Sequence, residues 1–491
     1  MIPLFDKVTD KKALDNAVKR FREKGIVLPT FAQQQNPDRI PDKIKDQLRH
    51  IGLWDMHPLN LFRITWKNEP KEHGGLFGPP NLIEIPAEIT GVKARIIMLV
   101  GKWFPTGAHK VGAAYGCLTP RIITGGLDPT RHKAVWPSTG NFCRGGAFDC
   151  KLMGTDAIAI LPEEMSPERF SWLRDEVGCE VIATPGCESN VKEIYDACWE
   201  IKKTRPDCII LNQFEEFGNA VWHYHITGNA LKEIYDLSTH SGSRLAAYVS
   251  ATGSAGTIAA GDYLRKVFPG VKVVASEALQ CPTLLHNGFG GHRIEGIGDK
   301  HVPWIHNVKN TDMVTAIDDE DCIRIFRLFN ERQGQDYLQS LGMPAEDIAR
   351  LPLLGISCIA NIISAIKVAR YFELTKDDII LSIATDSASL YQSRLAEQSI
   401  TKGPYHREQA IKDLEKCLLG AGIDNMKELS YPDKKAIHNL KYFTWVEQQQ
   451  KDVADLNTLW DDPKIWDVQF DQVKRWDELI MEFNDRTGLI D

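Results

Sequence analysis

Residues 101–116 read GKWFPTGAHKVGAAYG, and this stretch decides which fold the chain is expected to adopt. It follows an apolar run, Arg95–Val100, that has the length and composition of a strand. Lys110 stands between a Pro-Thr-Gly turn and small residues that begin a helix, so a bulky ligand has room beside it. Burial would disfavour its ammonium form, and a neutral amine attacks an aldehyde carbon. A lysine that caps the helix or pairs with a carboxylate fits this stretch equally well.

Short apolar runs recur between about residues 86 and 400, separated by helical patterns such as Ile356–Tyr371. Besides Arg95–Val100, the predicted strands are Lys133–Trp136, Ala157–Leu161, Glu180–Ala183, Cys208–Leu211, Leu245–Val249, Val271–Ser276 and Asp378–Ala384. Continuous apolar runs indicate strands covered on both faces, and their alternation with helices indicates βαβ units. We therefore expect an α/β fold with two parallel-sheet lobes, and ligands beyond the carboxyl ends of the strands.

The two ends of the chain differ from this middle region. Residues 1–85 are predicted to form an N-terminal extension, residues 86–400 the two lobes, with the smaller lobe at roughly 120–225, and residues 401–491 a helical C-terminal extension. Within the last part, residues 470–483 carry large apolar side chains at three- and four-residue spacing. That spacing is typical of a helix that docks through one apolar stripe.

Composition excludes several classes of protein. The 491 residues carry a formal net charge of -8, which gives no general attraction for nucleic acid or anionic membranes. No segment approaches the roughly 20 apolar residues of a membrane span, and the first residues do not resemble a secretory signal. The eleven cysteines include no C-x-x-C pair, which argues against a zinc site or a disulfide framework. We expect a cytoplasmic protein without a metal, a nucleic-acid partner or a membrane partner.

A second polar loop follows the predicted strand Lys133–Trp136. Its residues Ser138, Thr139, Gly140 and Asn141 offer backbone N–H groups and short polar side chains at the start of a helix. This arrangement suits a carboxylate, although a plain helix N-cap has the same composition. Gly145 and Gly146 follow within the helix and favour close approach of a ligand.

Two further loops also follow strands. Residues 252–257, TGSAGT, place glycines at a helix start, as phosphate-binding turns do. Their G-x-x-G spacing matches neither the dinucleotide fingerprint nor the P-loop, so a phosphate monoester is favoured over a nucleotide, and a simple tight turn stays open. Residues 384–391, ATDSASLY, place Thr385 and Asp386 where a side chain could meet a ring nitrogen or cap the next helix.

Together these loops resemble the fold-type II pyridoxal-phosphate (PLP) enzymes, which include tryptophan synthase β subunits, cysteine synthases and threonine dehydratases. PTGAHK is similar to the family segment P-T-G-S-x-K, which implies that Lys110 holds PLP as a Schiff base. STGN is similar to the family loop that receives the substrate carboxylate, which implies this role for Ser138, Thr139 and Asn141. The same resemblance places Asn141 against the cofactor's ring hydroxyl. Phe142 and Cys143 depart from the small polar residues usual after that asparagine.

The resemblance extends to four more segments. ATGSAGT is similar to the family's phosphate loop, which implies that the cofactor phosphate is bound by Thr252, Gly253, Ser254, Ala255, Gly256 and Thr257. Residues 212–228 resemble a family segment whose glutamine faces the substrate, here Gln213. Residues 294–298, IEGIG, resemble the I-x-G-I-G loop beside the reacting carbon. Thr385 stands where the family places a hydroxyl against the pyridine nitrogen, and Asp386 is the alternative contact.

The reaction implied by this resemblance is an α,β-elimination on a small β-substituted amino acid through an aminoacrylate, with Lys110 as the base. We thus expect a PLP-dependent lyase. β-Replacement, as in cysteine synthases, and thiolase-type C–C chemistry are the alternatives. Glu295 is the predicted second catalytic group, ahead of His223, His225, Glu215, Glu216 and His292. The family's usual assembly implies a homodimer.

The sequence is also compatible with a protein of another functional class. The same sheet could carry a non-catalytic amino-acid or nucleotide binding protein. An NAD enzyme would require G-x-G-x-x-G followed by an acidic residue, and residues 253–256 do not supply that pattern.

Overall fold

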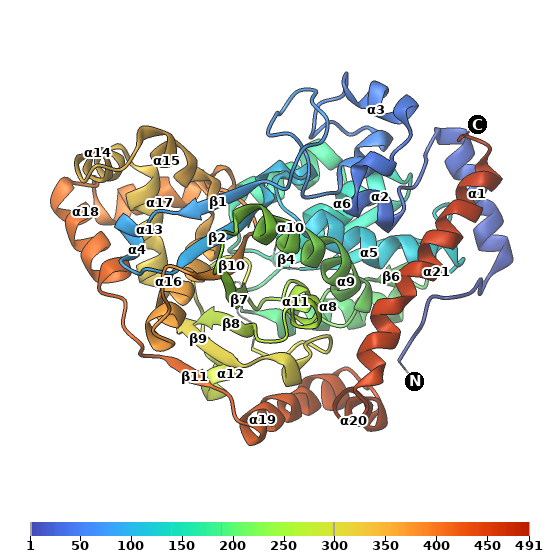
Figure 1. Ribbon diagram of the computed structural model, residues 1–491. Helices are drawn as coiled ribbons and strands as arrows, with labels where there is room; N and C mark the ends of the chain where they lie inside the picture. Colours follow the sequence, from blue (N-terminus) through green and yellow to red (C-terminus); the bar gives the residue numbers. More distant parts are fainter. Residues whose placement is uncertain (1, 139, 188, 298–299, 491) are drawn as a thin grey trace.

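The computed structural model of the chain describes residues 2–138, 140–187, 189–297 and 300–490 (Figure 1). Its α-helices are α1 Lys11–Lys24, α2 Phe31–Gln35, α3 Asp42–Leu48, α4 Ala87–Thr90, α5 Lys110–Ile123, α6 Asn141–Leu152, α7 Pro167–Ser171, α8 Val191–Thr204, α9 Phe217–Trp222, α10 Gly228–Ser238, α11 Ala259–Val267, α12 Thr283–His286, α13 Asp319–Asn330, α14 Arg332–Ser340, α15 Ala345–Arg350, α16 Ile356–Tyr371, α17 Gln392–Lys402, α18 Arg407–Leu414, α19 Tyr431–Lys441, α20 Val453–Asp461 and α21 Lys464–Thr487.

The strands form two sheets, one in each lobe. The larger sheet has the order β1-β2-β10-β7-β8-β9-β11, and its two edge strands, β1 and β11, are antiparallel to their neighbours. Its strands are β1 Leu82–Ile85, β2 Arg95–Val100, β7 Arg244–Ala251, β8 Lys272–Ala278, β9 Met313–Ile317, β10 Asp378–Ala384 and β11 Met426–Glu428. The smaller sheet is parallel throughout, in the order β5-β4-β3-β6. Its strands are β3 Lys133–Pro137, β4 Asp156–Pro162, β5 Glu180–Thr184 and β6 Cys208–Ile210.

The predicted α/β fold with two sheet-based lobes is confirmed, and all eight predicted strands are present. Three strands were not predicted. β1 and β11 are short edge strands in which charged residues interrupt the apolar pattern, and β9 is a five-residue run between loops. β1 and β11 also lie outside the predicted 86–400 region, because both ends of the chain contribute to the larger sheet. The domain boundaries themselves stay predictions.

The terminal extensions pack together on the side of the smaller lobe. Helix α21 lies beside α1, α2, α5 and α9 (Figure 1). The rings of Phe21 and Phe483 meet edge to face at 5.0 Å, and both carboxylate oxygens of Asp477 accept backbone N–H groups at the start of α2. The predicted stripe on residues 470–483 is thus a docking face within the chain, since Phe470, Trp476 and Ile480 are buried.

Within the described residues, no single helix is both long and apolar enough to cross a bilayer. Residues 345–353 and helix α16, which are bent by 116° relative to each other, are together long and apolar enough by length and composition alone.

Candidate active site

Three of the predicted loops meet because their strands are neighbours in the larger sheet. β2, β10 and β7 are adjacent and parallel, so the loops after Val100, Ala384 and Ala251 leave the same edge of the sheet. The loop after β3 of the smaller sheet faces them. These loops enclose a cavity of about 20 Å³. It is lined by Lys110, Ser138, Asn141, Phe142, Gln213, Phe214, Gly253, Ser254, Gly296, Ile297 and Thr385.

Lys110 lies at the centre of this arrangement as the first residue of α5. Its Nζ donates to Ser254 Oγ at 2.9 Å and to Gln213 Oε1 at 3.4 Å. The turn before it is unusual, because Thr106 adopts a left-handed conformation with φ of 70°. Such backbone strain is maintained where the surrounding structure fixes it, and it sets the direction in which α5 begins.

The loop 252–257 is a rigid turn between β7 and α11. Thr252 N–H and Oγ1 both donate to Ser276 O, at 2.9 and 3.1 Å, and Thr257 Oγ1 lies 2.8 Å from Ser250 Oγ. Ala255 has φ of +61°, a left-handed conformation that occurs in turns whose successive backbone N–H groups can bind an anion. The hydroxyls of Thr252 and Thr257 therefore hold the loop, while Ser254 Oγ reaches Lys110.

Glycine is required at position 253 by a close approach of two loops. A Cβ atom there would lie 2.7 Å from Gly296 O, which is shorter than any ordinary carbon–oxygen contact. The loop 293–297 consequently closes over the turn 252–257 and contributes Gly296 and Ile297 to the cavity. The predicted segment 294–298 extends one residue further, and Gly298 lies outside the described residues.

Asn219 is a site residue that the sequence analysis did not single out. Its side chain is completely buried, and its Nδ2 donates to Ser254 Oγ and to Gln213 O, both at 3.0 Å. The amide thus ties the loop that carries Gln213 to the loop that carries Ser254. The sequence signal that could have identified Asn219 is its place as the single polar residue among the apolar and small residues of α9.

On the smaller lobe, Asn141 lines the cavity through one end of its amide. Its Nδ2 donates to Asp386 Oδ2 at 2.7 Å, so the orientation of the amide is set by the carboxylate, which accepts only. Asn141 Oδ1 is buried without a hydrogen-bond partner. An acceptor therefore remains for a ligand that donates a hydrogen bond.

Thr385 and Asp386 point to different surroundings. Thr385 lines the cavity, and its Oγ1 lies 3.3 Å from Nε2 of His109, whose pKa burial lowers well below the usual value. Asp386 is outside the cavity lining and completely buried, and Tyr391 OH donates to its Oδ2 at 2.6 Å. Burial raises the pKa of Asp386, while the bonds from Tyr391 and Asn141 oppose that shift. Thr385 is thus the residue of the two that faces Lys110.

Two other predicted substrate residues, Ser138 and Gln213, also line the cavity. Ser138 Oγ accepts from Gly140 N–H at 3.0 Å. Thr139 lies outside the described residues. Phe142 packs edge to face on Trp136 at 5.3 Å and occupies the space where a small polar residue was expected.

Glu295 lies away from the cavity in a buried ionic cluster. Its Oε1 accepts from Arg394 Nε at 2.6 Å, and its Oε2 lies 3.2 Å from Arg169 Nη2. Both Glu295 and Arg169 are almost completely buried. Its predicted catalytic role stays a prediction, and these contacts give the carboxylate a structural one.

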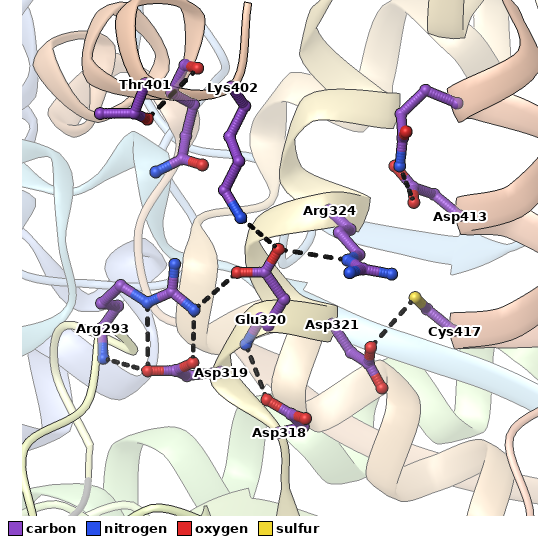
Figure 2. Close-up of polar contacts among 12 residues, drawn as sticks. Arg293, Asp318, Asp319, Glu320, Asp321, Arg324, Thr401, Lys402, Asp413 and Cys417 are labelled. Carbon is purple, nitrogen blue, oxygen red and sulfur yellow. Dashed lines mark hydrogen bonds and ion pairs between the residues drawn. The ribbon is translucent and has the colours of Figure 1, made fainter.

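The same loop is anchored at its first residue, Arg293, by a more exposed ionic cluster (Figure 2). Arg293 binds Asp319 at 2.6 Å and Glu320 at 2.8 Å, both at the start of α13. Burial opposes ionisation of Glu320, but hydrogen bonds from Arg293, Lys402 and Arg324 lower its pKa to about 2. Loop 293–297 is therefore held by ion pairs at Arg293 and Glu295, directly before the two residues that line the cavity.

The residues present fit a PLP molecule. Lys110 offers the amine, the turn 252–257 offers successive backbone N–H groups for a phosphate, and Asn141 Oδ1 is a buried acceptor without a partner. Among the described residues, no group of three or more His, Cys, Asp or Glu side chains is placed to hold a metal.

The fold and this site define a two-lobed PLP enzyme. Residues 81–338, more than half of the chain, match the family described as "Pyridoxal-phosphate dependent enzyme", and the chain belongs to that family, with PLP as its cofactor. A probable cysteine synthase of Bacillus subtilis is 28% identical over 301 residues, which cover 61% of this chain and 89% of that protein. Cysteine synthase B of Campylobacter jejuni is 30% identical over 261 residues, 53% of this chain and 77% of that protein.

Solved structures share the same fold. The crystal structure of O-acetyl serine sulfhydrylase isoform 3 from Entamoeba histolytica superposes with a TM-score of 0.56 at 23% identity, over 70% of this chain and 94% of that one. The terminal regions that extend beyond the matched residues 81–338 include α1, α2 and α21.

Proposed function

We propose that the chain catalyses a PLP-dependent α,β-elimination on a small β-substituted amino acid. The observation that carries this proposal is the position of one amine. Among the described residues that line the cavity, Lys110 is the only acid or base, and it lies 2.9 Å from the turn that suits a phosphate. A reaction that one base can serve, by removing the α-proton and later returning a proton, matches this site.

The other lining residues bind and orient the substrate. PLP supplies the electron sink for the charge left at Cα. Ser138 and Gln213 present a hydroxyl and an amide to the cavity, and Asn141 offers its backbone N–H at the start of α6, so these groups can hold the substrate carboxylate and direct the α C–H bond toward the amine. Phe142 and Phe214 exclude water and leave room for only a small side chain, which supports elimination from a short substrate.

β-Replacement is the second candidate, and the relatives favour it. Two of the matched proteins are named as cysteine synthases. The first half of such a reaction is the same elimination, so the residues around Lys110 serve both. Elimination and β-replacement differ in what reacts after the β-substituent has left: water in the first case and a second nucleophile in the other.

Borohydride reduction of the purified protein tests the proposed site directly. We expect the cofactor to become fixed to Lys110, seen as a mass increase on the peptide that contains residue 110, and to be absent from Lys110→Ala. A mass increase on another lysine would contradict the assignment. A panel of β-substituted amino acids, with and without sulfide, then separates the reactions. Ammonia release without sulfide supports elimination, and a new thiol product formed only with sulfide supports replacement.

A further inference from the structure

A line of buried polar side chains leads away from the cavity behind Thr385. Thr385 Oγ1 lies 3.3 Å from Nε2 of His109, and the ring of His109 meets that of His223 edge to face, with centroids 4.8 Å apart. Nδ1 of His223 lies 2.8 Å from Thr227 Oγ1, which also accepts the indole N–H of Trp66 at 2.9 Å. Of these five residues, Thr385 is the one that lines the cavity. The line therefore connects a wall of the cavity with groups behind it.

Both imidazole rings in this line are neutral. His109 and His223 are completely buried, and burial lowers the pKa of each ring well below its usual value. A neutral imidazole carries one N–H, so one of its two nitrogens is a donor and the other is an acceptor. Each ring therefore has two possible tautomers.

The tautomer of His109 decides what Thr385 offers to the cavity. With the hydrogen on Nε2, His109 donates to Thr385 Oγ1, and the hydroxyl hydrogen of Thr385 is free to point into the cavity. With the hydrogen on Nδ1, Nε2 of His109 accepts that hydroxyl hydrogen, and Thr385 offers the cavity only a lone pair. A donor and an acceptor at this position suit different ligand atoms.

Two ring nitrogens in the line lack a hydrogen-bond partner. Nδ1 of His109 and Nε2 of His223 are buried, and neither has a partner among the described residues. They belong to the two rings that contact each other. Buried polar atoms are normally satisfied, and one neutral ring can donate what the other accepts. One hydrogen between these nitrogens satisfies both and couples the two tautomers.

Trp66 and Thr227 select the direction of the line. The indole N–H can only donate, so it occupies one lone pair of Thr227 Oγ1. Nδ1 of His223 is then the acceptor for the hydroxyl hydrogen of Thr227, and this bond places the hydrogen of His223 on Nε2. In the opposite direction, the hydroxyl of Thr227 is a completely buried donor without an acceptor, which is the more costly arrangement.

We propose that His109 and His223 are positioning residues that fix the direction of the Thr385 hydroxyl. Nε2 of His223 donates to Nδ1 of His109, and Nε2 of His109 donates to Thr385 Oγ1. The hydroxyl hydrogen of Thr385 consequently points into the cavity, toward an acceptor such as the unprotonated pyridine nitrogen of PLP. This inference rests on the proposed binding of PLP beside Lys110. It adds that two residues outside the cavity control how the ring nitrogen of the cofactor is bound.

Nitrogen-15 NMR of the histidine rings in the holoenzyme tests the direction. Ring nitrogens with and without a hydrogen give separate resonances, and the signals lost in His109→Gln and His223→Gln assign them. We expect both rings to be neutral near pH 7, with the hydrogen on Nε2 and with Nδ1 bare. A hydrogen on Nδ1 of either ring, or a doubly protonated ring, would overturn the proposal.

His223→Phe breaks the line while keeping a flat ring in place. The Nδ1 resonance of His109 should then move toward that of a nitrogen without a hydrogen bond. Because hydrogen bonds in a chain strengthen one another, we also expect PLP to bind about two- to threefold more weakly. His223→Gln retains a donor and an acceptor, and should restore the affinity and the His109 resonance. His109 resonances in His223→Phe equal to the parent's would make His223 a packing residue and contradict the proposal.

His306→Phe is the matched control. His306 is also buried, and its Nε2 lies 2.8 Å from Thr311 Oγ1, but neither residue lines the cavity. This variant should leave the His109 resonances and the PLP affinity unchanged. If His223→Phe does not fold, the tautomers of the parent and the affinity of His223→Gln still decide. Borohydride labelling of Lys110 tests the cofactor site separately, because the histidine resonances are read whether or not Lys110 holds PLP.

Discussion

The two loops that face each other across Lys110 are held in place by different means. The turn 252–257 is fixed inside the larger lobe, where Thr252 binds Ser276 O and Thr257 binds Ser250. The loop that ends at Asn141 is held from the other lobe, through the hydrogen bond to Asp386. The proposed phosphate side of the site is therefore built within one lobe, whereas the geometry of the proposed substrate side depends on the two lobes being together.

A buried polar network makes this contact between the lobes. Arg169 of α7 in the smaller lobe reaches Tyr391 OH at 3.2 Å and Glu295 at 3.2 Å in the larger one. Its guanidinium also lies directly against Gly140, where a Cβ atom would be 2.0 Å from Nη1 and where φ is +153°. Arg169 therefore presses on the substrate loop while being held by the opposite lobe.

Glu295→Gln is expected to produce the largest loss, because it removes the carboxylate shared by two arginines. Leaving the buried Arg169 without its counter-charge should lower the free energy of unfolding by about 3 kcal/mol. Turnover should fall as the lobes close less well, while the absorbance of bound PLP is retained. Chemical denaturation and steady-state kinetics measure the two effects.

The matched control for this variant is Glu164→Gln, because the exposed Glu164 meets Arg394 only through its backbone carbonyl. If Glu295→Gln were as stable and as active as the parent, the network would not hold the lobes.

Ser254→Asp tests the side of the site that one lobe builds alone. A carboxylate against the cofactor phosphate should weaken PLP binding by about 100-fold, because like charges in contact cost several kcal/mol. Equilibrium dialysis gives the affinity, and Ser254→Ala, which adds no charge, should lose much less. Equal PLP occupancy in Ser254→Asp and the parent would show that the phosphate is bound elsewhere.

Asp386→Asn gives a smaller effect that reports on the orientation of Asn141. Once the carboxylate is gone, the Asn141 amide is free to turn its Nδ2 toward the cavity, in place of Oδ1. We expect the balance between the two absorbance bands of bound PLP to move toward the form with an ionised ring hydroxyl, with PLP affinity changed by about tenfold or less. An unchanged spectrum would mean that Asp386 does not control the amide.

Glu320→Gln should have the smallest effect, because its ion pairs are partly exposed (Figure 2). At neutral pH we expect a loss of about 1 kcal/mol or less. The folded-state pKa of Glu320 is about 2, below its usual value, so its contribution is present above about pH 4.5 and is lost as the pH falls toward 2. Thermal melts of the variant should therefore show a weaker pH dependence in that window than the parent does.

Much of the fold follows from local pattern. Asp378–Ala384 and Ile356–Tyr371 match their predicted bounds at every residue, because most of their side chains are apolar and buried, and this pattern is visible in the sequence. The edge strand Met426–Glu428 carries no such pattern, since its pairing with β9 is what makes it a strand. The sequence likewise brought Lys110 and Ser254 into one predicted site, because each follows a buried strand.

The residues of the site also divide into those that local sequence pattern predicts and those whose place depends on tertiary contacts. The sequence by itself singled out the loops that carry Lys110, the turn 252–257 and Ser138 with Asn141, since each depends on residue types at fixed spacing within one segment; their phosphate and carboxylate roles stay predictions. Only the tertiary structure decided that Thr385 faces the cavity while Asp386 and Glu295 enter the network between the lobes. The physical reason is that the donors around a carboxylate set its direction. Asn141 reaches Asp386, and Arg394 and Arg169 reach Glu295, from segments far apart in the chain.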